Sequence, residues 1–526
     1  MLNTQGEIKF SEYAFLYDML VPADNKYRLI DELIDFDFIY DELKDKYCLD
    51  NGRKAADPVM LFKYLMIKAI DNLSDVDVVE HSRYDLSYKR FLGLMPEDSV
   101  IDPSLLTKFR RQRLKDVNLL DLLIAKTVGV AIEKGILKSK TIIVDATHTI
   151  SRANPMFPID VLRSRSKALR NRIKEWDNNY EDKLPLANHD NNLKNELEAS
   201  ETLIEFVLSD SMLSNNPAFQ ESINYLAEAV EDVHCHHAIS HDREARTGHK
   251  SAETSFFGYK THLAMSSERI ITAATVTTGE KTDGQQLPDL VYKTENAGMA
   301  IDTIIGDAAY SGKDNIVLAK EKNITLAAKV NELIVNGHVV ERSRMDDQFT
   351  YNKDADRYIC PAGILSSVGV HNKKRPNDSV IVRYQWSGRK CSICKWREEC
   401  LVKQKAKNIY VRLISDEHKE QIEFQKSDEF RLLSRERYKI EAKNSELKNI
   451  HGYNRAESYG LSALELQGAV TIFVVNLKRI IKLIGKYRAN CSYLNSIVKV
   501  IPLRIECLKQ KHKSRGDKHI LYSQRH

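Results

Sequence analysis

Ile142-Ile143-Val144-Asp145-Ala146-Thr147 is a run of apolar, mostly β-branched residues that ends in a carboxylate. Such runs are typical of strands that are covered on both faces of a sheet. A second run, Ile304-Ile305-Gly306-Asp307, ends in the same way. A carboxylate at the end of a buried strand costs free energy unless it is paired or binds a cation. An Asp in this position also commonly caps a helix or opens a turn, so either Asp alone has two interpretations.

A third acidic residue, Glu441, lies in Arg437-Tyr438-Lys439-Ile440-Glu441, and Lys448 follows seven positions later. Seven positions make two helical turns, so Glu441 and Lys448 are expected to share a helix face. Glu446 lies roughly 140° around the same helix, so both glutamates cannot face one metal pair. Three converging carboxylates suit Mg²⁺, which prefers oxygen ligands. Two such ions about 3.5–4 Å apart can activate a nucleophile and stabilise the leaving oxygen in phosphoryl transfer.

The spacing Arg437-x3-Glu441-x6-Lys448 resembles the C-terminal pattern of DDE transposases from bacterial insertion sequences. The family pattern is Tyr-x2-Arg-x3-Glu-x6-Lys, and this chain departs from it at Ser434, which stands at the Tyr position. Further similar segments are Gly258-Tyr259-Lys260-Thr261-His262, His451-Gly452-Tyr453-Asn454-Arg455-Ala456-Glu457 and Asn476-Leu477-Lys478-Arg479. Together the similar segments run from about Tyr17 to about Ile481, which is most of the chain.

The resemblance implies an RNase H-like core and the cutting and joining of DNA with two Mg²⁺ or Mn²⁺ ions. It implies that Asp145, Asp307 and Glu441 are the catalytic, metal-binding triad, and that Arg437 and Lys448 contact DNA. The implied substrates are double-stranded DNA of the element's terminal inverted repeats and target DNA, handled by a homodimer. Two alternatives stay open: a metal-dependent nuclease or resolvase without strand transfer, and a catalytically inactive DNA-binding remnant.

The chain is expected to have an α/β fold, because strands and helices alternate around both Asp runs. With the resemblance, we expect an RNase H-like mixed sheet with flanking helices, a helical N-terminal domain and a β-rich, Cys-containing insertion. The expected parts are a helical DNA-binding domain at 1–116, a first core part at 137–335 with a helical insertion at 151–241, a β-rich insertion at 336–411, a last core part at 412–505 and a basic tail at 506–526. Further strands are expected at 259–265, 270–277 and 325–330, and a helix at 314–322.

Basic residues cluster in two predicted helices. The first cluster follows Asp102-Pro103, which marks a helix start, and consists of Lys108, Arg110, Arg111 and Arg113. It can neutralise DNA phosphates, or it can be a solvated helix face. The second cluster lies in the insertion, between Arg163 and Lys174. It can grip DNA, or its members can form surface ion pairs within the insertion.

Four of the eight cysteines fall within one window of the β-rich insertion: Cys360, Cys391, Cys394 and Cys400. A Cys-x2-Cys pair in a cytosolic protein indicates metal or redox chemistry before it indicates a disulfide. Four thiolates complete a structural zinc site. Cys360 stands alone, however, so the spacing departs from the usual paired halves. A structural Zn²⁺ and buried thiols without a metal therefore both remain open.

Length and composition bound these expectations. A chain of 526 residues is too long for one ordinary core, so two to four domains are expected. The net charge of +5 is too small to indicate a nucleic-acid partner, and local clusters must carry that argument. The sequence has no signal peptide pattern and no apolar run of about 18 residues. We therefore expect a cytoplasmic protein that makes no use of a membrane.

Overall fold

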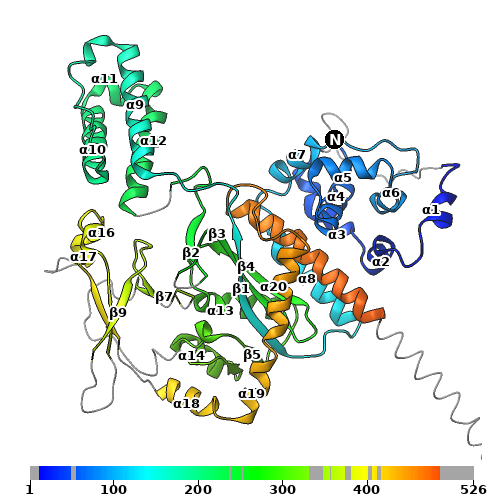
Figure 1. The fold of residues 1–526 in the computed structure, drawn as a ribbon. Coiled ribbons are helices and arrows are strands. Elements are labelled where there is room, and N and C mark those ends of the chain that lie inside the picture. The colour runs from blue at the N-terminus through cyan, green and yellow to red at the C-terminus, as the bar shows by residue number, and fades with distance from the viewer. Residues whose placement is uncertain are drawn as a thin grey trace, which may run out of the picture.

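The computed structural model describes residues 11–48, 55–235, 239–250, 253–330, 348–352, 354–355, 357–372, 381–400, 406–411 and 416–485. The expected basic tail at 506–526 lies outside these residues. Within them the chain forms a mixed α/β structure around one central sheet (Figure 1). The predicted α/β class is therefore confirmed.

The central sheet is built from β1 to β6. Its strands are β1 (Thr141–Ile150), β2 (Arg246–His249), β3 (Ser255–Ser266), β4 (Ile271–Thr278), β5 (Thr303–Ile305) and β6 (Thr325–Ala327). β1 lies in the middle, antiparallel to β3 on one side and parallel to β5 on the other. β4 pairs antiparallel with β3, and β6 pairs parallel with β5. Each expected core strand is present within a few residues of its predicted bounds.

Both faces of the sheet are covered, because successive residues of β1 enter different cores. Ile142 and Val144 pack with side chains of α13 (Leu287–Asn296) and α14 (Lys313–Glu321). Ile143 belongs to a second core that also includes α8 (Leu119–Glu133) and a helix over residues 461–485. The continuous apolar run before Asp145 therefore has the two-sided burial that its sequence predicts.

The N-terminal helices, apart from the first of them, share this second core. They are α1 (Phe15–Leu20), α2 (Lys26–Leu33), α3 (Asp37–Leu43), α4 (Pro58–Asp71), α5 (Asp75–Ser82), α6 (Leu86–Leu92) and α7 (Ser104–Gln112). The rings of Phe36 and Phe62 lie 6.5 and 5.9 Å from the ring of Phe473 in the 461–485 helix. Asp57 caps α4 by accepting a hydrogen bond from the Val59 amide, with Pro58 in the first turn. The N-terminal helices thus pack directly on a C-terminal helix.

Between β1 and β2 the chain forms a helical bundle with its own apolar core, and the bundle stands away from the sheet in Figure 1. Its helices are α9 (Pro158–Trp176), α10 (Leu193–Ser209), α11 (Ser211–Ser214) and α12 (Pro217–His234). The arginines and Lys174 of α9 are occupied within the bundle, whereas Lys167 is exposed. Arg163 pairs with Glu196 at 3.2 Å, and Lys174 pairs with Glu181 at 2.8 Å. These contacts favour the surface ion-pair interpretation of this cluster over the DNA-gripping one.

The cysteine window folds between β6 and the last helices. Its elements are β7 (Thr350–Asn352), β8 (Arg357–Ile359), β9 (Ser367–Asn372), β10 (Ile381–Gln385), α16 (Gly388–Ser392), α17 (Arg397–Cys400) and β11 (Asn408–Val411). They make a two-stranded and a three-stranded sheet. The chain then continues through α18 (Asp416–Phe424), α19 (Asp428–Arg435) and α20 (Tyr438–Asn449). No helix among the described residues has the length and apolar character needed to cross a membrane.

Candidate active site

Asp145 and Asp307 lie side by side on neighbouring strands of the sheet. The expected strand end at Asp145 is wrong, because β1 continues to Ile150, whereas Asp307 does follow the end of β5. The parallel register pairs Ile143 of β1 with Ile305 of β5, and each Asp follows two residues later. Asp307 is 7% exposed, and its Oδ1 accepts a hydrogen bond from the Ala309 amide at 2.7 Å. Asp307 thus also caps the short turn that follows it, so the two interpretations of this Asp are compatible. The sheet topology alone brings the two carboxylates together.

The electrostatics of this pair are unfavourable without a cation. The pKa of Asp145 is raised to about 7, chiefly by burial and next by the neighbouring Asp307. Arg437 acts in the opposite sense and favours the charged form. A buried carboxyl beside a second carboxylate is a donor set whose negative charge a divalent cation would neutralise.

Helix α20 lies against β1 and carries the third acid (Figure 1). The Asn444 Nδ2 group donates a hydrogen bond to Asp145 Oδ2 at 3.0 Å. One turn further on, Lys448 Nζ lies 3.4 Å from His148 Nε2. Glu441 precedes Asn444 by three positions and Lys448 by seven, so it belongs to the helix face that meets β1. Its side chain is 58% exposed and accepts a hydrogen bond from Arg437 Nη2 at 3.2 Å.

The rival glutamate is occupied elsewhere. Glu446 Oε2 accepts a hydrogen bond from Lys443 Nζ at 2.7 Å, and the Lys443 side chain is only 3% exposed. A buried ammonium group needs a counter-charge, which gives Glu446 a structural role. Of the two glutamates, Glu441 is the one on the face that meets β1.

Cations and a neutral histidine line the approach to the two Asp residues. Burial lowers the pKa of Lys448 to about 8, and nearby Lys250 lowers it as well, while Asp145 opposes both. Burial also lowers the pKa of His148 to about 3, with Lys448 and Lys250 acting in the same direction. His148 is therefore an uncharged imidazole at neutral pH, which can accept a hydrogen bond from Lys448.

Two parts of the chain match family models. Residues 15–112 match a model described as a transposase domain (DUF772), and residues 359–481 match one described as a transposase DDE domain. The chain belongs to the DDE-type transposases of insertion sequences. No curated protein matches it in a sequence comparison. The second match contains Glu441 and Lys448 of the transposase, whereas Asp145 and Asp307 lie outside both matches.

Two residues near the acids of the transposase were not predicted from its sequence. Asn444 could have been found from helical spacing in the sequence, because it lies on the same helix face as Glu441 and Lys448. Asp283 had no such signal, because it lies in an irregular segment after β4. Asp283 is buried and accepts a hydrogen bond from Lys260 Nζ at 3.0 Å. It also raises the pKa of Asp145, although by less than burial and Asp307 do.

The predicted N-terminal cations of the transposase divide into two pairs. Arg110 binds Asp75 through both terminal nitrogens. The guanidinium carbon of Arg113 lies 4.3 Å from the centroid of the Tyr47 ring, and Arg113 Nη1 donates a hydrogen bond to the Lys46 carbonyl. Lys108 and Arg111 are exposed. The side chains of Arg110 and Arg113 thus make contacts that hold the N-terminal helices together, and DNA contact by these four residues stays a prediction.

Three of the four cysteines pack against one small apolar cluster. Cys360, Cys391 and Cys400 pack against the core that contains Trp386, and all four side chains are partly exposed. Burial raises the pKa of Cys360 to about 11, and nearby Cys394 and Cys400 contribute in the same direction. Within the described residues, no three His, Cys, Asp or Glu side chains are arranged as a ready metal-ligand set. Zinc binding by these thiols stays a prediction.

Proposed function

We propose that this transposase cleaves DNA and joins the freed 3′ end to target DNA, with Asp145, Asp307 and Glu441 as the catalytic triad. The observation that carries the proposal is the position of α20 on β1. The Asn444–Asp145 hydrogen bond ties the helix of Glu441 to the strand of Asp145, beside Asp307. These contacts support a site in which Glu441, one helical turn before Asn444, acts together with the two Asp residues.

The proposal includes an RNase H-like core. Its support is the strand order β4-β3-β1-β5-β6. In this order β3 is antiparallel to both β4 and β1, and β5 and β6 run parallel to β1. The helical bundle after β1 and the cysteine-containing sheets after β6 are then insertions into this core. We propose the domain boundaries 1–116, 137–335, 336–411 and 412–505 on the same basis, with a cytoplasmic location beside the DNA substrate.

The acidic residues fit Mg²⁺ or Mn²⁺ by their donor chemistry. Asp145 and Asp307 supply carboxylate oxygens, which these ions prefer, and Glu441 completes the set. When bound, two such ions supply Lewis-acid stabilisation of a phosphodiester and an activated nucleophile. The elevated pKa of Asp145 agrees with this assignment, because a nearby positive charge would return that carboxyl to its ionised form.

The cationic side chains around the acids have positioning roles in this proposal. Lys448 is a point charge that can hold a non-bridging phosphate oxygen, and neutral His148 keeps its ammonium group in place. Arg437 orients Glu441 through their hydrogen bond and offers further donors to the DNA backbone. No Ser or Tyr nucleophile is required, so no covalent protein–DNA intermediate forms.

The test uses duplex DNA that carries the inverted repeats flanking the coding region. Asp145→Asn and Asp307→Asn keep the side-chain shape but remove the charge that binds a cation. Each is expected to abolish Mg²⁺-dependent cleavage and to leave binding of the repeat intact. Wild-type cleavage rates in either variant would refute the triad.

Strand transfer is tested separately with pre-cleaved ends that already carry a 3′-OH. Joining of these ends to a supercoiled plasmid supports the transposition reaction. Cleavage without joining would assign the alternative of a nuclease or resolvase, and neither reaction in the wild-type protein would assign an inactive DNA-binding remnant. Two element ends require at least two active sites, so we propose a homodimer on paired ends.

A further inference from the structure

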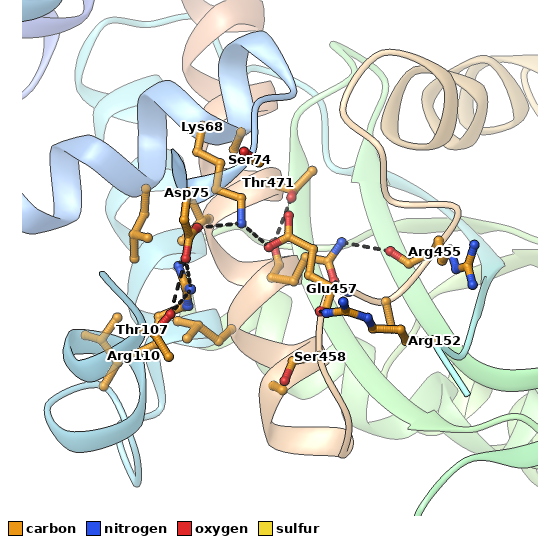
Figure 2. A pocket seen from close by; sticks show the side chains of 18 of the residues that line it. Lys68, Ser74, Asp75, Thr107, Arg110, Arg152, Arg455, Glu457, Ser458 and Thr471 are labelled. Atoms are coloured by element: carbon orange, nitrogen blue, oxygen red, sulfur yellow. Dashed lines mark hydrogen bonds and ion pairs between the residues drawn. The ribbon is translucent and has the colours of Figure 1, made fainter. Parts of the chain in front are cut away.

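A large cleft lies between the N-terminal helices and the segment 451–471, at a distance from the three acids. Its volume is about 1340 Å³. One wall comes from α4, α5 and α7, and the other from residues 451–471, with Arg152 at the edge. Figure 2 shows Lys68 between Asp75 and Glu457, with Arg152 and Arg455 on the opposite side. Nothing in the proposed chemistry uses this cleft.

The cleft is strongly cationic. Its described lining contains two acidic residues, Asp75 and Glu457, and six cationic residues: Lys68, Arg110, Arg111, Lys115, Arg152 and Arg455. Lys68 pairs with both acids, and Arg110 also pairs with Asp75. Both negative charges are therefore already balanced within the wall.

Four cations of the cleft remain for a ligand. Arg111, Lys115, Arg152 and Arg455 are exposed, and none of them forms an ion pair with a described acidic residue. Arg152 donates one hydrogen bond, at 3.0 Å, to the carbonyl of Glu457, which uses one of its five N–H groups. Guanidinium groups with free donors are suited to phosphate oxygens.

The cleft is joined to the acid-bearing strand by direct backbone contacts. Ile150, the last residue of β1, forms a parallel bridge with Arg455. Its amide donates to the Asn454 carbonyl at 3.0 Å, and its carbonyl accepts from the Ala456 amide at 2.8 Å. Ile150 follows Asp145 by five positions on β1, which corresponds to about 17 Å along a strand. Lys448, beside His148, lies between the two along the strand.

We propose that this cleft binds the phosphate backbone of the same DNA duplex whose scissile phosphate lies at Asp145 and Asp307. The inference rests on the proposed function and adds a second, cationic contact to it. A spacing of about 17 Å corresponds to about five base pairs along one strand of B-DNA. Arg152, Arg455 and Arg111 therefore contact phosphates roughly five base pairs or more from the cleavage position.

The first test measures affinity for a random-sequence duplex against salt concentration, without divalent metal. The double variant Arg152→Gln with Arg455→Gln removes two phosphate contacts, so the log–log salt slope should shrink by about 1.8. The double variant Lys167→Gln with Lys194→Gln removes two exposed cations of the helical bundle and should leave the slope unchanged. Arg152→Lys with Arg455→Lys keeps the charges and should retain most of the slope.

An unchanged slope in the Arg152 and Arg455 glutamine variant, with an unchanged melting temperature, would overturn the proposal. So would an equal loss in the bundle control, because the effect would then follow net charge alone. This assay needs no cleavage. A transposase that binds through the cleft but never cuts DNA would therefore refute the proposed function and leave the cleft assignment standing.

The second test locates the contact on the DNA. Phosphate ethylation interference on the terminal repeat should show a group of sensitive phosphates about five base pairs from the cleavage position. These phosphates should lose their effect in the Arg152 and Arg455 glutamine variant, while those at the cleavage position keep it. The same interference pattern in both proteins would show that the cleft does not hold this duplex.

Discussion

Asn444 and Asp145 are joined by a hydrogen bond of 3.0 Å between residues 299 positions apart. We predict that Asn444→Ala lowers the cleavage rate about 10- to 100-fold, since residues that orient metal-binding carboxylates have effects of this size. The cause is loss of the donor that fixes Asp145 and the nearby turn of α20. Asn449→Ala is the matched control, because Asn449 bonds only to Ser445 on the same helix. Equal rates in the two variants would remove Asn444 from the site.

Substitutions of the two glutamates of α20 should have different effects on cleavage and on stability. We expect Glu441→Gln to abolish cleavage without a change in stability. The side chain is exposed, and the substitution removes only the proposed metal-binding charge and the ion pair with Arg437. Glu446→Gln should instead lower the free energy of unfolding by about 1–3 kcal/mol, because buried Lys443 loses its counter-charge. Cleavage assays and thermal unfolding measure the two effects. The reverse pattern would mean that Glu446 is the third acid.

Arg110 and Arg111 are neighbours with different expected roles. Arg110→Ala should lower the melting temperature of the N-terminal helices, because Asp75 loses a two-point ion pair, and should leave the salt slope of DNA binding unchanged. Arg111→Ala should keep the melting temperature and shrink the slope by about 0.9. Calorimetry and DNA titration on both variants check this. A slope change for Arg110 alone would contradict the assignment of its side chain to the helix core.

The cysteine window has a direct chemical test. We predict one structural Zn²⁺ per chain, bound by Cys360, Cys391, Cys394 and Cys400, with no open position for catalysis. Elemental analysis of protein purified without added metal should give about one equivalent. Zinc far below one equivalent, with four thiols that titrate readily in the native protein, would assign them as buried thiols of the Trp386 cluster.

Asp71 makes the stability of the N-terminal helices depend on pH. Burial alone would raise the pKa of Asp71, but hydrogen bonds from Lys26, Tyr27 and Tyr88 outweigh it and hold the pKa below its usual value. A lowered folded-state pKa adds stability that is complete above the unfolded pKa of about 3.9 and is lost as pH falls through the folded value. Asp71→Asn should therefore destabilise the protein at pH 7, and the difference should shrink below about pH 4. Unfolding curves across this range test it, and a constant difference would contradict the linkage.

The sequence predicted the parts of the site that local patterns determine. Apolar runs located β1 and β5, and their parallel pairing placed Asp145 beside Asp307, although the sequence did not show that β1 continues to Ile150. Helical spacing likewise placed Glu441 and Lys448 on one face. These features depend only on periodicity and on the rule that parallel strands share an edge.

The remaining features depend on contacts between distant segments. Helical periodicity predicted which face of its helix Arg110 occupies. It did not predict that Asp75, 35 positions earlier, contacts that face. The cleft has the same origin, because its Lys68–Glu457 pair joins residues 389 positions apart. The residue pattern within one helix does not show which other segment will cover each of its faces. The sequence therefore could not show which cations are exposed and which are buried.

Phe36 and Phe62 share a core with Phe473, and this has a consequence for synthesis on the ribosome. Translation adds about 5–20 residues each second, so the aromatic surface of the first helices waits roughly 20–90 s for its covering helix. During that time the nascent chain exposes apolar surface that chaperones bind. A prematurely terminated product that ends before the 461–485 helix lacks both that cover and, if it ends before α20, the third acid. Products that end before α20 lack one residue of the proposed triad, so we expect that they do not cut DNA and that the cell degrades them quickly.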